Sequence, residues 1–193
     1  MAFLVLNGWQ RIKRLNFIQK PSFGIQVTYK LSEKLLLNYS NFTGTDIQSN
    51  LNALRTFHNL YMQFAMSKKL GMIAGFDIGV QQKSKGSLHF NYWLSPVVIL
   101  RYDFNSQLAA ALRAEYYQDM DGTIIAVKTN AAFKTAGLSL NMDYKPISIM
   151  LFRLEGRWLN NETPIFENRN GLSRNNFFLT LSMCLKINRY LMK

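Results

Sequence analysis

The sequence predicts an all-β fold, an antiparallel up-and-down transmembrane β-barrel of about ten meander strands, complete or incomplete. Hydrophobic residues recur with a period of two along most of the chain, as in strands that have one apolar and one polar face. Short turns alternate with long connections, which is typical of outer-membrane barrels. No apolar stretch approaches the roughly 18 residues that a membrane-spanning helix needs.

The first four strands differ in how clearly they alternate. Residues 2–9 read as a strand that is cut short, whereas 22–31 alternate between apolar and polar side chains throughout. Residues 35–44 alternate at their start only, and 54–66 alternate in their second half. The sequence therefore predicts four strands in this part of the chain.

Six further segments alternate clearly and complete the set of ten. Strands of about 9–11 residues suit a tilted crossing of a bilayer. The six predicted strands cover residues 70–81, 97–104, 108–117, 137–144, 150–158 and 177–187.

The connections between these strands fall into two classes. Four are short and rich in turn-forming residues, at 32–34, 67–69, 105–107 and 145–148. The others are longer, at 10–21, 45–53, 82–92, 119–131 and 161–174. Short turns at one end and long loops at the other define an up-and-down meander.

The composition fits one domain, which we take as residues 1–193. Apolar residues make up 48% of the chain and charged residues 18%, which is too apolar for a disordered chain and low in charge for a soluble domain. One cysteine excludes an internal disulfide framework or a cysteine-based zinc site, and two histidines do not suggest a metal centre. We expect no cofactor and no metal.

The two faces of the predicted sheet differ in charge. The apolar face is almost free of charge, and aromatic side chains near several strand ends are typical of the girdles at a membrane interface: Tyr29, Tyr102, Tyr116, Tyr144 and Trp158. The polar face also carries Lys30 and Lys186 at strand ends. We predict that the apolar face contacts lipid and that the polar face lines a lumen, with the pore-lining residues Asp77, Arg101, Asp103, Arg113, Glu115, Asp143, Arg153, Glu155 and Arg157.

Opposite charges on the polar face suggest ion pairs between strands. We interpret two groups as charges on one face of adjacent strands: Arg113 with Glu115, and Arg153 with Glu155 and Arg157. They form either an electrostatic constriction for solutes or a structural ladder of cross-strand pairs. Five acids and six bases on this face indicate a braced wall and not a strongly ion-selective pore.

The surplus of base lies elsewhere in the chain. Lys and Arg number 23 against 11 Asp and Glu, so the net charge is +12, and most of it falls in turns, loops, termini and the weaker strands. Basic loops suit contact with lipopolysaccharide and anionic outer-membrane lipid. Regular meander strands do not fit a nucleic-acid-binding OB-fold, so nucleic acid is not an expected partner.

Motifs for catalysis or metal binding are weak. His58 lies on the face opposite Asp77 and His89 lies in a loop, and no Gly-x-Ser-x-Gly elbow is present, so a hydrolase is not expected. Asp119-x-Asp121-Gly begins like a calcium loop, but position twelve is Asn130 instead of Glu, which favours a polar turn. The lone Cys184 is interpreted as a small side chain on the polar face.

Several motifs, in matching order and spacing, resemble those of the OmpL-like β-barrel porin family over nearly the whole chain. They are VLNGWQ at 5–10, LLLNYSNF at 35–42, GFDIG at 75–79, RAEYYQDMDG at 113–122 and RLEGR at 153–157. The resemblance implies an outer-membrane barrel that passes small solutes, with no catalytic motif. Family members are longer and carry a secretion signal, so the resemblance also implies that this chain is the C-terminal part of such a protein.

Other interpretations remain open. The N-terminus has no basic region before its apolar run and no small-residue cleavage site, which makes it a poor signal peptide and favours a fragment or truncated product. A structural or adhesive barrel without an open pore, a soluble ligand-binding barrel of the lipocalin kind, and assembly into a homo-oligomer are alternatives.

Overall fold

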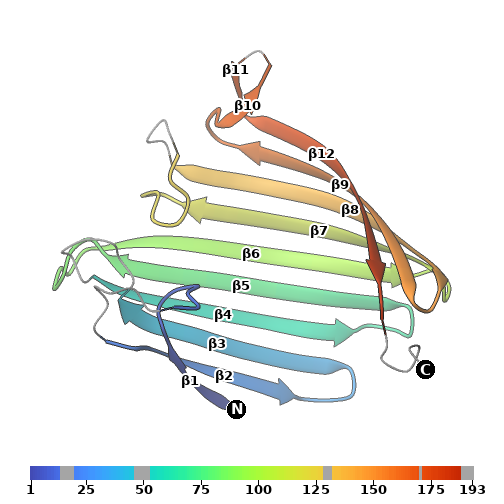
Figure 1. Cartoon of the computed structure of the whole chain (residues 1–193), viewed down its shortest axis with the longest axis horizontal. Coiled ribbons are helices and arrows are strands. Elements are labelled where there is room, and N and C mark those ends of the chain that lie inside the picture. Colours follow the sequence, from blue (N-terminus) through green and yellow to red (C-terminus); the bar gives the residue numbers. More distant parts are fainter. Residues whose placement is uncertain (14–19, 46–52, 128–131, 170, 188–193) are drawn as a thin grey trace.

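The structure is a computed structural model, and it describes residues 1–13, 20–45, 53–127, 132–169 and 171–187 (Figure 1). Twelve strands form among these residues: β1 (Ala2–Leu6), β2 (Ser22–Lys30), β3 (Leu35–Thr45), β4 (Leu54–Ala65), β5 (Leu70–Gln82), β6 (Phe90–Asp103), β7 (Leu108–Asp119), β8 (Phe133–Ile147), β9 (Met150–Asn161), β10 (Phe166–Asn168), β11 (Gly171–Ser173) and β12 (Asn175–Leu185). Parts of four predicted long connections lie outside the described residues.

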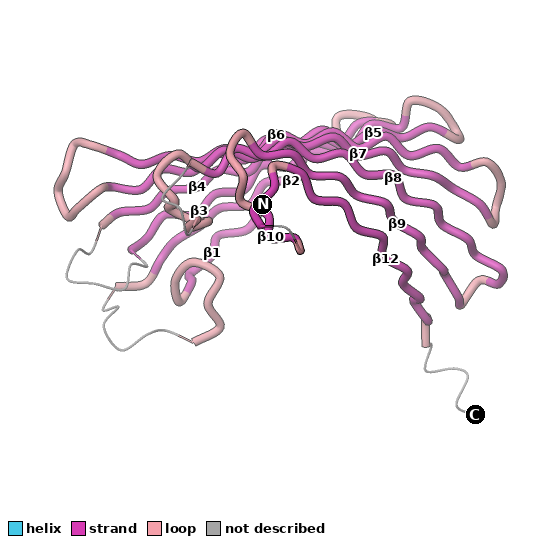
Figure 2. The backbone as a smooth tube through the Cα atoms, turned by 90° about the horizontal axis from the view of Figure 1, so that it is seen from above, coloured by secondary structure: helices cyan, strands magenta, loops and turns pink. Residues whose placement is uncertain are grey.

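Ten of these strands form one antiparallel sheet in chain order, from β1 to β9 and then β12. The predicted ten-strand meander is therefore confirmed. Figure 2 shows that the sheet bends into an arch, with β1 and β12 as the two edges on opposite sides. The sheet is open, because the described residues of these two edge strands do not pair with each other. None of the described residues forms a helix long and apolar enough to cross a membrane.

The short turns share one local device. The side-chain oxygens of Ser32, Ser67 and Asn105 each accept hydrogen bonds from the backbone N–H groups two and three residues later, at 2.8–3.2 Å. Such side chains mimic a backbone turn and fix its direction. Three of the four predicted tight turns therefore form for the same local reason.

The structure differs from the prediction in four places at the long-loop end. β6 and β8 begin earlier than predicted, at Phe90 and Phe133. The connection 161–174, predicted as a loop, contains the hairpin β10–β11. β1 ends at Leu6 because the chain then turns through two positive φ angles, 134° at Gly8 and 53° at Gln10. The first of these is a conformation that glycine adopts without strain.

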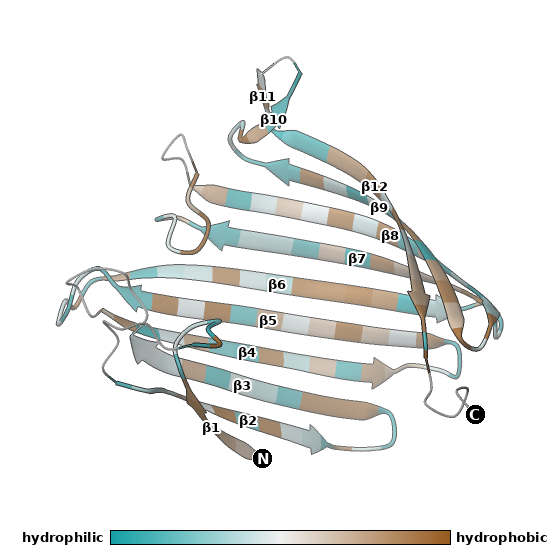
Figure 3. Ribbon diagram, viewed as in Figure 1, coloured by the Kyte–Doolittle hydropathy of each residue, from teal (hydrophilic) through white to brown (hydrophobic). Residues whose placement is uncertain are grey.

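Alternation assigns each strand residue to one of two faces. Residues directly opposite each other in the register share a face, and neighbours along a strand face opposite sides. Large apolar side chains dominate the convex outer face, where Leu140 and Leu181 are 51% and 74% exposed. Figure 3 shows the resulting alternation of hydropathy along the strands.

The distribution of buried side chains is the reverse of that in a soluble domain. Among the described residues, the buried apolar side chains are Phe42, Ala53, Trp93 and Ala109, whereas eight buried residues are polar or charged. A soluble chain of this length fills its core with apolar side chains. A sheet with an apolar exterior and a polar concave face instead matches a membrane barrel.

Aromatic side chains border the convex face at two levels. Tyr29, Tyr102 and Tyr144 lie toward the short turns, and Tyr92, Tyr116 and Trp158 lie toward the long loops. On β6, the ten residues from Tyr92 to Tyr102 span ~33 Å along the strand at ~3.3 Å per residue. A strand tilt of about 40° reduces this to ~25 Å, the height of the apolar band of a membrane barrel.

Candidate functional site on the concave face

All nine residues predicted to line a pore lie on the concave face. The strand register places them there, because residues opposite each other share a face. Asp77 is opposite Ser95, Arg101 is opposite Ala111, and Glu155 is opposite Asn141. The structure gathers seven of the nine into two ion-pair clusters, each named for its central carboxylate: Asp143 with Arg101, Asp103 and Arg153, and Glu115 with Arg113 and Arg157.

The Asp143 cluster connects three strands. Asp143 on β8 accepts two hydrogen bonds from Arg153 on β9, from Nε at 2.6 Å and from Nη2 at 2.9 Å. Arg101 on β6 reaches across β7 to the same carboxylate at 2.9 Å and also pairs with Asp103 at 3.0 Å. Charge-assisted and bidentate bonds of this kind are the stronger hydrogen bonds of proteins. The cluster therefore fixes β6, β8 and β9 relative to one another.

The Glu115 cluster also connects strands that are two apart. Glu115 on β7 accepts hydrogen bonds from Arg113 on its own strand and from Arg157 on β9. The prediction that these charges lie on adjacent strands is wrong, because β8 lies between β7 and β9.

Small residues on the intervening strands explain this reach. A Cβ atom at Gly137 of β8 would lie 2.7 Å from the Glu115 carboxylate and 3.0 Å from Leu159, so the glycine leaves the path over β8 open. On β7, Ala109 and Ala111 lie opposite Asp103 and Arg101 and leave room for the Arg101 side chain to cross. Long side chains at these positions would fill the same space.

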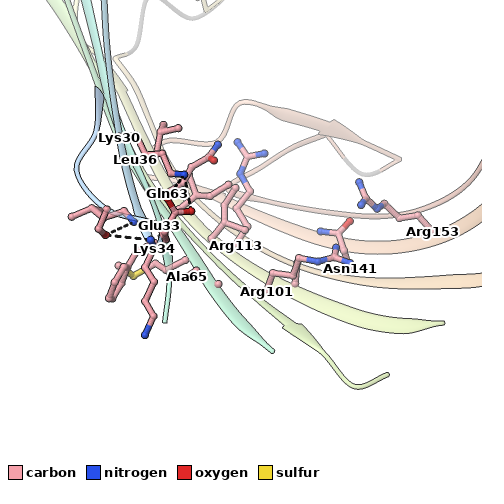
Figure 4. Close-up of a pocket in the computed structure, with 18 of the residues that line it drawn as sticks. Lys30, Glu33, Lys34, Leu36, Gln63, Ala65, Arg101, Arg113, Asn141 and Arg153 are labelled. Carbon is pink, nitrogen blue, oxygen red and sulfur yellow. Dashed lines mark hydrogen bonds and ion pairs between the residues drawn. The ribbon is translucent and has the colours of Figure 1, made fainter. Parts of the chain in front are cut away.

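A hollow of about 670 Å³ lies on the concave face toward the short turns (Figure 4). Its wall includes Arg101, Arg113 and Arg153 on one side and Lys30 and Lys34 on the other. Figure 4 shows these side chains with Gln63 and Asn141 around the opening.

The two remaining predicted residues lie outside the ion-pair clusters. Asp77 accepts a hydrogen bond from the Asn59 side chain at 2.5 Å. Glu155 borders the hollow directly opposite Asn141. Lys186, predicted on the polar face of the last strand, follows the end of β12 at Leu185.

An aromatic cluster near the long loops was not predicted from the sequence. After β1, the chain folds back so that Trp9 packs edge-on against Phe42, Phe57 and Trp93, with ring centroids 5.1, 4.9 and 6.2 Å away. The Arg55 guanidinium lies 5.5 and 5.7 Å from the Trp9 and Trp93 ring centroids. Such contacts stabilise through the ring quadrupole in addition to apolar burial.

The sequence contained one weak signal for this cluster. Gly79 lies opposite Trp93, and any Cβ at that glycine would overlap the indole ring. An apolar ring among polar positions, opposite a glycine, indicates a side chain that packs inside the arch instead of facing lipid. Without the fold, however, nothing connects Trp93 with the distant Trp9.

The weaker chemical motifs do not assemble into sites. His58 lies on the convex face and its Nδ1 is 2.6 Å from the Tyr39 hydroxyl, so Asp77 on the concave face cannot orient it. Asp119 accepts backbone N–H bonds from Thr123, Ile124 and Ile125 at 2.7–3.0 Å, as in the predicted polar turn. Asn130 lies outside the described residues.

Two further expectations concern sulfur and metals. Cys184 lies opposite Leu151 on the concave side of β12 and is exposed. Within the described ranges, no group of three or more His, Cys, Asp or Glu residues is arranged to hold a metal ion.

Comparison with known protein families gives a match over most of the chain. The family model described as putative beta-barrel porin-2, OmpL-like, matches residues 1–187 of the 193-residue chain, which includes all ten strands of the sheet. No curated protein and no solved structure matches the chain.

Proposed function

The chain belongs to the OmpL-like β-barrel porin family, and from this premise we propose that it lets small solutes cross the outer membrane passively. Family membership implies the outer membrane as the location and a channel in place of an enzyme. In the proposal, solutes move along the concave face, past the two ion-pair clusters. Outer-membrane lipid contacts the convex face, and the basic loops contact lipopolysaccharide.

The reversed distribution of side chains carries this proposal. Charged and polar side chains gather on the concave face, while large apolar side chains are exposed along the convex face. A barrel of this kind keeps water inside and lipid outside. The clusters brace the wall and at the same time border the hollow, so the structural and the constriction interpretations of these charges are compatible.

The experiment that tests the proposal uses two neighbouring alanines on opposite faces of β7. In a Cys184→Ser background, which removes the lone thiol, Ala111→Cys introduces a thiol on the concave face and Ala110→Cys introduces one on the convex face. The chain is refolded in detergent and studied in planar bilayers. We expect stable single-channel steps whose conductance falls when a bulky thiol reagent modifies Ala111→Cys, and no change for Ala110→Cys. A folded, heat-resistant protein without steps, or equal responses of the two variants, would contradict the proposal.

The aromatic cluster supports a second candidate, a structural barrel without an open pore. Trp9 and its neighbours occupy the concave face near the long loops, where they narrow any passage. If they close it, the intact chain gives no steps. The conductance of a variant without Trp9 separates a closed barrel from a constricted one.

Trp9→Ala is expected to raise single-channel conductance, because it removes the ring at the centre of the cluster. It is also expected to lower the free energy of unfolding by about 2 kcal/mol, less than a fully buried tryptophan because Trp9 is half-buried. Trp158→Ala, on the convex face, is the control and should leave conductance unchanged. Unchanged conductance of a folded Trp9→Ala channel would show that the cluster does not restrict the passage.

A further inference from the structure

The acidic and basic side chains of the concave face differ in how far they are exposed, which a count of charges does not reveal. The carboxylates of Asp143 and Glu115 are only 5% and 14% exposed, whereas Arg101, Arg113 and Arg153 are 37–43% exposed. The acids therefore lie against the wall and the guanidinium groups lie above them. A solute on the concave face meets the cations first.

The wall of the hollow has the same bias. Five cations line it, namely Lys30, Lys34, Arg101, Arg113 and Arg153, against two carboxylates, Glu33 and Glu155, which gives a net charge of +3. Asp143 and Glu115, the partners of the three arginines, do not line the hollow. Lys30 is paired with Glu33 at 2.7 Å, and both line the hollow. The arginines are paired as well, but with carboxylates that lie behind them, so the charge facing the hollow comes mainly from the arginines and Lys34.

The arginines also have hydrogen-bonding capacity left. The Nε–H of Arg113 is buried and has no acceptor in the part of the chain described, so the capacity open to a solute comes from the exposed part of the side chain, which is 38% exposed while its guanidinium donates to Glu115. Gln63 and Asn141 add neutral amide donors to the rim of the hollow. Guanidinium and amide N–H groups are the donors that recognise carboxylate and phosphate oxygens.

We infer that the hollow on the concave face is a selectivity site that admits small oxyanions, such as carboxylate- or phosphate-bearing solutes, in preference to cations. The inference rests on the proposed function, because it names the class of solute for the same lumen. A cationic wall around a confined space raises the local concentration of anions and lowers that of cations. The hollow can therefore prefer anions even though the concave face holds near-equal numbers of acids and bases.

The test compares two thiol reagents of opposite charge on the Cys184→Ser/Ala111→Cys chain refolded in detergent. The anionic reagent is sulfonatoethyl methanethiosulfonate and the cationic one is trimethylammonioethyl methanethiosulfonate. Ala111 lines the hollow beside Arg101, so the reaction rates report the local potential. Relative to free cysteine, we expect the anionic reagent to be favoured about tenfold. Equal rates, or faster reaction of the cationic reagent, would overturn the inference.

Charge-removal variants identify the source of the preference. Arg113→Gln with Arg153→Gln should abolish most of the preference, and Lys34→Gln should reduce it without changing a partner of Asp143 or Glu115. Lys68→Gln is the matched control, since this exposed lysine lies at the same end of the sheet but does not line the hollow. A preference that survives Lys34→Gln and the double arginine variant, or that falls equally in Lys68→Gln, would refute the assignment to the hollow.

The assay needs only the folded sheet, so it separates failure of the inference from failure of the proposed function. If the reagents show an anion preference in detergent but the chain does not conduct in bilayers, the anion site is supported and the proposed pore is not. Conductance with equal reagent rates would leave a pore without this selectivity. In a conducting chain, a salt gradient should give a reversal potential that indicates chloride as the more permeant ion.

Discussion

Arg153→Met is expected to lower the free energy of unfolding by about 3 kcal/mol, because it removes two charge-assisted bonds from the buried carboxylate of Asp143. Breaking a buried pair from one side costs about 3–5 kcal/mol. The lower end applies here because the Arg153 side chain is 43% exposed and Arg101 still pairs with Asp143. Unfolding by urea of the chain in thin-bilayer liposomes, followed by tryptophan fluorescence, measures the change.

Two further variants separate the loss of the buried pair from a general effect of charge. Asp103→Asn removes a carboxylate that is 48% exposed and, within the described residues, pairs with Arg101, so it should cost at most about 1 kcal/mol. Adding Asp143→Asn to Arg153→Met should restore part of the lost stability, since a neutral amide needs no counter-charge. If the double variant is no more stable than Arg153→Met, the buried charge is not what destabilises the single variant.

The two clusters also show how far alternation in the sequence predicts such a wall. Period-two alternation assigned all nine candidate residues to one face, because a residue's face follows from its position in the strand. It did not predict which charges meet. Glu115 pairs with Arg157 across β8, and that reach depends on Gly137, whose role appears only once the register is known.

The predicted strand boundaries were wrong outside the apolar band, where convex residues need not be apolar. On β8, Phe133 lies on the concave face and Lys134 on the convex face, the reverse of the pattern further along the same strand. Tyr116, opposite Ala136, belongs to the aromatic level toward the long loops, and both residues lie beyond it. Outside the apolar band a convex residue no longer has to be apolar, so the strand continues while its sequence pattern does not.

The aromatic cluster could not be predicted for a different reason. Its contacts join Trp9, Phe57 and Trp93, which are far apart in the sequence, and the first of them follows a turn at Gly8 that reads like any loop. Periodicity reports the environment of residues within one strand. It carries no information about a segment that leaves the sheet and folds back onto it.

The assignment of the convex face to lipid predicts a loss of stability similar to that of Arg153→Met. Two neighbouring residues of β8 test it. Leu140→Arg is expected to cost about 2–4 kcal/mol, the penalty for arginine at the bilayer midplane on the lipid face of a barrel. Leu140 lies midway between Tyr144 and Ala136, and therefore midway between the two aromatic levels. Asn141→Arg introduces the same charge one residue away on the concave face, directly opposite Glu155, where it gains a counter-charge.

We therefore expect Leu140→Arg to fold in detergent but to be strongly destabilised in liposomes, while Asn141→Arg stays within about 1 kcal/mol of the parent chain. The same unfolding assay in liposomes measures both. Equal losses in the two variants would mean that charge alone, and not contact with lipid, sets the cost. A larger loss for Asn141→Arg would reverse the assignment of the faces, because the concave side would then be the one in the hydrocarbon.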